Sequence, residues 1–515
     1  MRMREITIQY DAVPLLPDQD TSDEDETNFT SDPRYKTVVT NDGPVVLKRQ
    51  LGLASCISVI VGSAIGSGIF VSPKGILQEV PNVNISLVLW VVCGIVNTLG
   101  ALSYGELGTT YSKSGGDYIY LLESFGPMIG FLRIWTSLVA VRTGSIMVVL
   151  LTASVYILKP LIGSTCEDLP EVAIRLITAV LTCCLFYINC VSVKWTSRIQ
   201  QFLTVAKVLG LITIIVPGIY LFFKGHRDHF NEGFQSDIQY ANLPLALYSG
   251  MYAYSGWQSL PQLTEEIQKP QRTIPLSIII SMVLITSLYL LVNISYFTVL
   301  SAQDVLNSEA VALAYWQAAF SQMLWVVAMI VTASCIGSAN GSIFSTSRMY
   351  FASSREGQLP TLFSMIHINY KTPVPAILIM VPFCLLCLTS NSIYSLINYL
   401  SFTKWLFLGL SAATIPYNRW KHPEWKRPFK VPLFVPVTFV VFCFFLVSMS
   451  LYSAPVECGV GLLLMLSGIP VYLIGVGNGK GPVNHRQSSL SLWLQKLLLI
   501  VQEEKSTYKS YHKTK

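Results

Sequence analysis

Long apolar stretches separated by short polar segments fill most of this chain. They cover residues 51–71, 85–104, 128–157, 171–190, 199–222, 243–262, 276–300, 319–343, 374–390, 394–415, 432–453 and 456–477. A helix needs roughly 20 mainly apolar residues to cross the hydrocarbon core of a bilayer, and each stretch meets that need within tolerance. The pattern therefore predicts an all-α membrane protein with about twelve transmembrane helices.

Two of these runs are interrupted by glycine near their centres. Gly66 and Gly68 interrupt the first run, and Gly250 and Gly256 interrupt the sixth. Glycine inside a helix costs about 1 kcal/mol relative to alanine, and unwound backbone persists in a bilayer only where protein or a water-filled cavity supplies hydrogen-bond partners. Interrupted segments at matching places in two halves of a chain are typical of a transporter binding site. The alternative is that these glycines only allow helices to pack closely.

The positions of Lys and Arg predict the orientation of the runs. If the N-terminus is cytoplasmic, the inner loops contain most of these residues, including a dense group at 419–430. The outer connections after the seventh, ninth and eleventh runs contain none. The positive-inside rule then predicts that both termini are cytoplasmic. The broken runs are the first and the sixth, so equivalent points are five spans apart. Because five is odd, the second copy is inverted, and runs 1–5 and 6–10 are predicted to form an inverted repeat, followed by two further helices.

Composition supports a membrane protein and divides the chain into three parts. The chain is 52% hydrophobic and 12% charged, whereas a soluble protein carries about twice that charged fraction. The predicted parts are an acidic, disordered cytoplasmic N-terminus at 1–47, a transporter domain at 48–478 and a cytoplasmic tail at 479–515. Within the tail, Trp493, Leu497 and Ile500 fall on one face of a predicted amphipathic helix, a pattern typical of the membrane interface.

Few polar side chains in the runs could carry chemistry. Lys207 lies near the middle of the fifth run, where a lysine costs about 2.5–3.5 kcal/mol on insertion scales and should therefore face a partner inside the protein. The alternative is that its side chain snorkels to the headgroups. Arg142 and Lys404 could each line a substrate pathway or point away from it. No Asp or Glu lies deep in a run and all 6 His lie in loops, so no proton relay, metal, cofactor or enzyme activity is predicted.

Cys166 lies in a polar segment that this topology places outside the cell. Disulfides persist in that oxidising environment. Because the segment contains no second cysteine, Cys166 could form an intermolecular disulfide or remain a free thiol.

Several motifs resemble those of the light subunits of the heteromeric amino acid transporters, the L-type family of the amino acid–polyamine–organocation superfamily. They include VGSAIGSGIFVSPKG, GALSYGELGTTYSKSGGDYIYL, SCIGSANGSIFSTSR and SREGQLP, and the likeness runs from about residue 46 to 502. The resemblance implies a LeuT-like fold with a 5+5 inverted repeat, broken helices 1 and 6, and transport by alternating access.

The resemblance also implies a set of functional residues. Backbone amides at the first break would bind the substrate carboxylate, and carbonyls at the second break would bind its ammonium group, as helix dipoles favour. The substrate-binding residues would be Ile65, Gly66, Ser67, Gly68, Tyr252, Ala253, Ser255, Trp257, Gln258, Phe402 and Trp405. Lys207 would replace a sodium ion near Ser338 and Ser342. Cys166 would form a disulfide with a single-span glycoprotein heavy subunit.

The predicted function is sodium-independent exchange of neutral, large or aromatic L-amino acids at the plasma membrane by the light subunit of a disulfide-linked heterodimer. Dibasic-preferring members of the family carry Asp where this chain has Ser255, and the small Ser67 and Ser255 leave volume for a large side chain. Lys404 stands where the family is usually neutral, so acidic substrates become plausible if it lines the pocket. The alternatives are an exchanger for cystine, dibasic or acidic amino acids and, more remotely, a channel.

Overall fold

A computed structural model describes ten segments of the chain. These are residues 49–111, 113, 115–162, 170–230, 243–308, 311–320, 324–388, 393–453, 455–475 and 489–502. The chain divides into Met1–Pro44 and Val45–Lys515, and every described residue belongs to the second unit. The N-terminal segment predicted to be disordered and Cys166 therefore lie outside the described residues.

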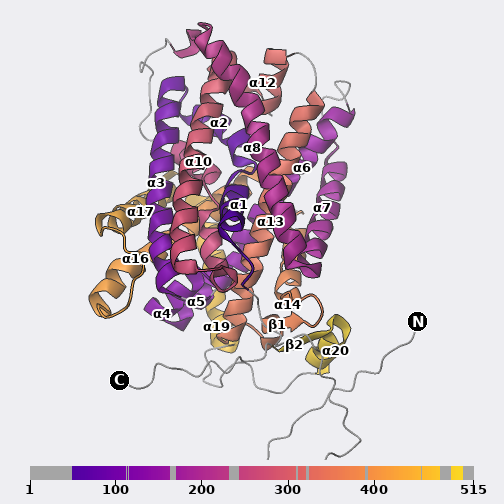
Figure 1. The fold of residues 1–515 in the computed structure, drawn as a ribbon, viewed down its shortest axis with the longest axis vertical. Coiled ribbons are helices and arrows are strands. Elements are labelled where there is room, and N and C mark those ends of the chain that lie inside the picture. Colours follow the sequence, from indigo (N-terminus) through magenta and orange to yellow (C-terminus); the bar gives the residue numbers. More distant parts are fainter. Residues whose placement is uncertain are drawn as a thin grey trace, which may run out of the picture. The chain divides into compact units, whose positions relative to one another are not determined.

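The described part is almost entirely helical (Figure 1). Its α-helices are α1 (Leu53–Ala64), α2 (Gly68–Glu79), α3 (Val83–Thr110), α4 (Asp117–Phe125), α5 (Pro127–Thr136), α6 (Arg142–Ile162), α7 (Glu171–Val191), α8 (Val193–Phe223), α9 (Leu243–Ala253), α10 (Pro270–Val299), α11 (Ala302–Asn307), α12 (Val311–Phe320), α13 (Leu324–Arg355), α14 (Val374–Leu378), α15 (Met380–Cys387), α16 (Ile393–Lys421), α17 (Phe434–Ser453), α18 (Pro455–Leu466), α19 (Gly468–Gly475) and α20 (Ser489–Leu498). The π-helix η1 (Ser137–Val141) joins α5 to α6, and η3 (Asp228–Phe230), η5 (Trp257–Glu266) and η6 (Thr361–Ser364) are 3₁₀ helices. Strands β1 (Met365–His367) and β2 (Ile500–Gln502) pair antiparallel, with Ile366 opposite Val501.

Seven of the described helical segments are long and apolar enough to cross a membrane, and the bent pair α1 and α2 makes an eighth if it counts as one span. They are α3, α5 with α6, α7, α8, α10, α13 and α17. This architecture agrees with the predicted all-α membrane protein. The twelve-helix count and the inverted repeat remain predictions.

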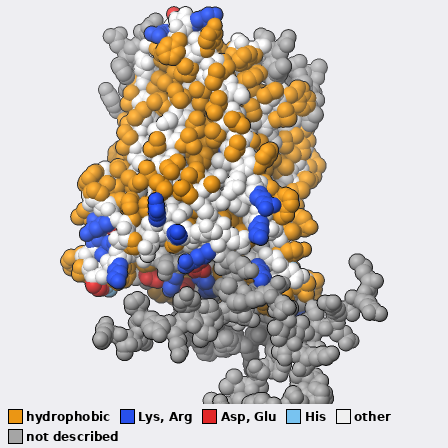
Figure 2. Space-filling view, viewed as in Figure 1, with side chains coloured by type: hydrophobic (Ala, Val, Ile, Leu, Met, Phe, Trp, Pro, Cys, Tyr) orange, Lys and Arg blue, Asp and Glu red, His pale blue; other side chains and the backbone are white. Residues whose placement is uncertain are grey.

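Helix α8 shows how such a chain distributes its side chains. Its buried stripe includes Gln200, Thr204 and Lys207, whereas Phe202 and Phe223 on its other side are 73% and 76% exposed. Exposed apolar side chains cover much of the surface in Figure 2. A soluble helix has the opposite arrangement, so α8 is built to face lipid on one side and a polar interior on the other.

Both interruptions predicted from glycine are present. Helix α1 ends at Ala64 and α2 begins at Gly68, with a 40° bend between them. Helix α9 ends at Ala253 and continues as the 3₁₀ helix η5 after Gly256, whose φ of 138° favours glycine. A Cβ at Gly256 would lie 2.6 Å from the backbone nitrogen of Ala64, so the two breaks lie directly against each other.

Helices α8, α10 and α13 pack around α1, which lies in the middle of the bundle in Figure 1.

Two buried ion pairs connect neighbouring elements. Arg348 of α13 binds Glu266 of η5 at 2.6 Å, and Arg133 of α5 binds Asp117 of α4 at 2.6 Å. Neither pair was predicted from the sequence. Removing one partner of a buried pair typically costs about 3–5 kcal/mol, so these contacts fix how the helices pack.

Candidate functional site

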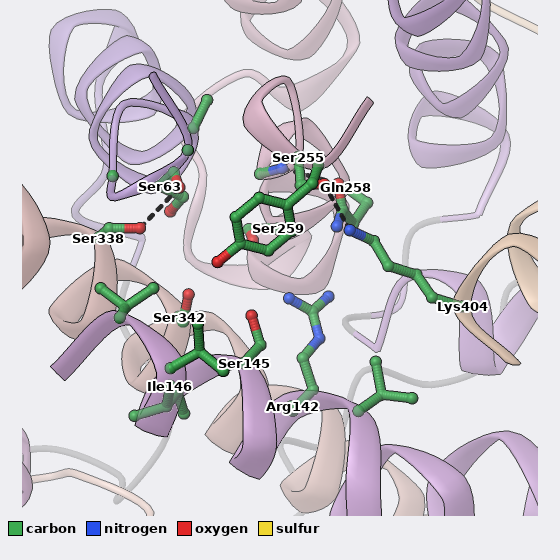
Figure 3. Close-up of a pocket in the computed structure, with 18 of the residues that line it drawn as sticks. Ser63, Arg142, Ser145, Ile146, Ser255, Gln258, Ser259, Ser338, Ser342 and Lys404 are labelled. Carbon is green, nitrogen blue, oxygen red and sulfur yellow. Dashed lines mark hydrogen bonds between the residues drawn. The ribbon is translucent and has the colours of Figure 1, made fainter. Parts of the chain in front are cut away.

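A cavity lies between the two helix breaks and the helices that face them (Figure 3). Its wall includes Ser63, Gly66, Ser67 and Gly68 from the first break, Tyr252, Ser255, Gln258 and Ser259 from the second, Arg142, Ser145, Ile146 and Val149 from α6, Ser338 and Ser342 from α13, and Lys404 from α16. The cavity therefore joins segments that are far apart in the sequence. Such a position suits a binding site that can change shape when helices move.

The first break offers donors to the cavity. Since α2 begins at Gly68, the first amides of that helix have no carbonyl partner within the helix, and the positive end of its dipole lies there. A Cβ on Gly68 would approach the Cα of Ala253 to 2.5 Å, so only glycine allows this close contact between the breaks. A helix start of this kind is suited to bind a carboxylate.

The second break offers acceptors. Helix α9 ends at Ala253, which places the negative end of its dipole at the cavity. The hydroxyl of Tyr289 lies 2.9 Å from the carbonyl of Ala64 and 3.1 Å from that of Ala253, and so it ties the two breaks together. The hydroxyls of Tyr252 and Ser67 lie 3.3 Å apart at the cavity wall. The positive dipole end of α2 and the negative dipole end of α9 thus face the same cavity. This arrangement suits a zwitterion.

Lys207 reaches the first break from α8. Its Nζ donates to the carbonyl oxygens of Gly62 at 2.7 Å, Ile65 at 2.6 Å and Ser334 at 3.0 Å. The side chain is only 1% exposed, so it does not snorkel to the surface. The bonds bridge α1 and α13, as a bound cation would.

Among the described residues, the hydrogen bonds of Lys207 do not include the hydroxyls of Ser338 or Ser342, which were expected beside it. Ser338 donates to the carbonyl of Ser63 at 2.8 Å, and Ser342 lines the cavity. Instead, Ser334 supplies the contact from α13, and its hydroxyl also donates to the carbonyl of Ile65 at 3.1 Å. Helical periodicity explains the difference, because Ser334 lies one turn before Ser338 on the same face.

Two cations whose direction the sequence left open point into the cavity. Figure 3 shows Arg142 and Lys404 reaching into the same space from α6 and α16. Nζ of Lys404 donates to Oγ of Ser255. In the amide orientation that satisfies its neighbours, Gln262 accepts from Arg142 Nη2 at 2.9 Å, while the buried Nε of Arg142 has no hydrogen-bond partner among the described residues.

The charge of the cavity wall is positive. Arg133 also reaches the wall, but Asp117 compensates its charge. No Asp or Glu belongs to the described lining, so Arg142 and Lys404 face the cavity without a carboxylate partner there. Two cations that face one poorly solvated cavity repel each other, and an anion bound between them would offset that repulsion.

The implied substrate-binding residues fall into two groups. Gly66, Ser67, Gly68, Tyr252, Ser255 and Gln258 line the cavity. Ile65, Ala253, Trp257, Phe402 and Trp405 are buried and are not part of the described lining. Trp257, for example, donates from Nε1 to Oδ1 of Asn97 at 3.0 Å and packs edge-on against Tyr104. Direct contact of these five with a substrate stays a prediction.

The sequence reading also missed part of the site. Ser145, Ile146 and Val149 follow Arg142 at helical spacing on α6 and share its face. Counting that period from Arg142 would have found them. Ser63 and Ser259 belong to the cavity lining, and their buried hydroxyl oxygens have no hydrogen-bond partner among the described residues.

Broken helices around a polar cavity in an apolar bundle define a membrane transporter. Residues 51–474 match the model of the amino acid permease family. The chain is 44% identical over 463 residues to the cystine/glutamate transporter of Homo sapiens, which covers 89% of this chain and 92% of that protein. It is 41% identical over 467 residues to the large neutral amino acids transporter small subunit 2 of Mus musculus, which covers 89% of this chain and 87% of that protein. It is 38% identical over 463 residues to the Asc-type amino acid transporter 1 of Mus musculus, which also covers 89% of this chain and 87% of that protein.

The chain therefore belongs to the amino acid permease family, and within it to the light subunits of heteromeric amino acid transporters. It is a transmembrane amino acid transporter and not an enzyme, as predicted from the sequence.

Proposed function

We propose that this protein exchanges amino acids independently of sodium and prefers substrates whose side chain carries a negative charge. The observation that carries the proposal is the pair of cations, Arg142 and Lys404, in a cavity wall that has no carboxylate among its described residues. This is the acidic member of the alternatives left open by the sequence. The large neutral preference predicted first is less well supported, because a neutral side chain would leave both desolvated cations without a counter-charge.

In this proposal the two breaks bind the carboxylate and ammonium groups of the substrate, and the two cations bind its side chain. The substrate carboxylate would accept hydrogen bonds from amides at the start of α2, and its ammonium would face the carbonyl end of α9. The side chain would then extend toward α6 and α16, where Arg142 and Lys404 would bind its anionic end. Guanidinium suits this task because its planar donors match the two oxygens of a carboxylate.

Exchange would proceed by alternating access. The broken elements α1, α2, α9 and η5 would move against α6, α7 and α13, with the cavity opening to one side at a time. Lys207 would provide the fixed positive charge that sodium-coupled carriers take from solution, so each cycle would need no sodium. The name of the human relative includes an acidic amino acid, glutamate, whereas the name of the large neutral amino acids transporter small subunit 2 includes neutral ones.

A counterflow panel tests this proposal. Liposomes containing the protein with a heavy subunit would be loaded with labelled glutamate and diluted into buffers that each contain one amino acid. We expect external glutamate or aspartate to accelerate efflux at least about tenfold more than leucine or lysine, a difference of about 1.4 kcal/mol, and choline to replace sodium without effect. Fastest efflux with leucine or phenylalanine would restore the neutral prediction, and fast efflux into plain buffer would indicate a channel.

We further propose a heavy-subunit partner joined through Cys166, with the complex in the plasma membrane and both termini cytoplasmic. Co-expressed with its heavy subunit, the protein is expected to migrate as a heterodimer on a non-reducing gel. Cys166→Ser should separate the two chains and retain part of the transport, because non-covalent contacts also hold such pairs. Cys458→Ser is the matched control and should leave the covalent band in place. Persistence of that band in Cys166→Ser would show that another cysteine forms the link.

A further inference from the structure

The C-terminal helix α20 presents an uncovered amphipathic face. Trp493 and Leu497 are 58% and 59% exposed, and the exposed Lys496 lies between them on the same face. A tryptophan and a leucine beside a lysine are typical of helices that lie in the membrane interface. Two large apolar side chains side by side on a polar segment also indicate a binding surface.

Strand β2 fixes the end of this helix to the bundle. Ile500 is 3% exposed and lies opposite His367, and the amide of Ile368 donates to the carbonyl of Leu499 at 3.0 Å. Because β1 precedes α14, the tail is attached to the connection between α13 and α14 (Figure 1). Helix α20 is therefore held at the end of the bundle where that connection lies.

The same connection touches the junction of α7 and α8. The hydroxyl of Thr372 donates to the carbonyl of Cys190 at 2.6 Å. Just beyond that junction, Lys194 and Arg198 are exposed, and Trp195 between them is 61% exposed. Tryptophan beside Lys and Arg at the end of a span marks a membrane–water boundary.

This end of the bundle is basic. None of the described residues in 190–200, 365–374 and 489–502 is Asp or Glu, although Glu503 and Glu504 follow directly in the sequence. Most Lys and Arg visible in Figure 2 also lie toward one end of the molecule. Positive charge and apolar side chains together complement a layer of anionic headgroups over acyl chains.

We propose that Trp493, Lys496 and Leu497 of α20, with Lys194 and Arg198 of α8, form a docking surface for the membrane leaflet that contains anionic phospholipid. The two apolar side chains insert below the headgroups, and the three basic ones contact phosphates and carboxylates. Docking holds α20 in the plane of the interface and keeps β2 paired with β1. The surface thus recognises a lipid class and is separate from the substrate cavity.

Hydrogen exchange of the full-length protein tests this surface. Amides in 489–502 would be measured in nanodiscs of phosphatidylcholine alone and of phosphatidylcholine with phosphatidylserine. We expect exchange to slow about fivefold or more with phosphatidylserine, the factor that corresponds to about 1 kcal/mol, the interaction of one basic residue with the surface. The double variant Trp493→Ser/Leu497→Ser should lose protection in both discs, and Lys194→Gln/Arg198→Gln should lose only the increment from phosphatidylserine. Leu463→Ser, an exposed apolar position on α18, is the control and should change neither value.

Equal exchange in the two kinds of nanodisc would overturn the proposal. So would a phosphatidylserine effect that survives Trp493→Ser/Leu497→Ser. Protection that arises only when the heavy subunit is present would assign this surface to a protein partner instead. None of these outcomes bears on amino acid exchange, because no transport is measured.

Discussion

Replacing Lys207 by alanine is expected to slow sodium-free exchange at least about a hundredfold, which corresponds to about 2.7 kcal/mol. The ammonium donates to three carbonyl oxygens, two of them at the C-terminal end of α1, those of Gly62 and Ile65. A buried acceptor that loses a charged donor is destabilised by about 1–3 kcal/mol, so the loss of these bonds leaves the first break without its support. Because those carbonyls define where α1 ends, substrate binding and the movement of α1 should both fail.

The measurement is sodium-free glutamate counterflow, normalised to the amount of protein in the liposomes. Lys224→Ala is the matched control, since Lys224 follows the same helix, is exposed and lies far from the break along α8. It should exchange at the normal rate. Near-normal exchange by Lys207→Ala would exclude Lys207 as the fixed charge that replaces sodium.

The breaks at residues 65–67 and 254–256 were predictable because glycine has a strong local effect in an apolar run. The direction of Lys207 was also predictable, because a lysine at that depth needs a partner and Gln200 and Thr204 share its stripe. These inferences depend on local sequence and on the bilayer as solvent. Neither requires knowledge of which helices are neighbours.

Other features depend on neighbours and could not be read from the sequence. Arg142 and Lys404 are separated in the sequence by more than half of the chain length, and nothing in the local sequence indicates that both face one cavity. Asp117 and Arg133 are close in the sequence, but their ion pair depends on how α4 packs against α5, which the sequence alone does not give. Trp257 was expected at the cavity surface, but its indole nitrogen donates a hydrogen bond to Asn97 of α3.

The contact between Lys404 and Ser255 changes what a substitution in the pocket should do. From the sequence alone, Ser255→Asp would create a site for lysine and arginine, because dibasic-preferring relatives carry Asp there. In the structure, Lys404 Nζ donates to Oγ of Ser255, so an aspartate at that position would form an ion pair with Lys404. The variant should therefore lose acidic substrates without gaining cationic ones. Only Ser255→Asp combined with Lys404→Ser should favour lysine and arginine.

Removing either cation should change the substrate preference itself. Arg142→Gln and Lys404→Gln are each expected to lower kcat/KM for glutamate about tenfold to a hundredfold, a loss of about 1.4–2.7 kcal/mol. Uptake of glutamine, which is neutral and of similar size, should fall much less. Uptake of both amino acids by each variant checks this, with Lys421→Gln as the control because Lys421 ends the same helix as Lys404 and is exposed. If both variants kept the glutamate-to-glutamine ratio of the parent protein, the cations would not contact the substrate side chain, and the preference for anionic amino acids would have to come from another part of the wall.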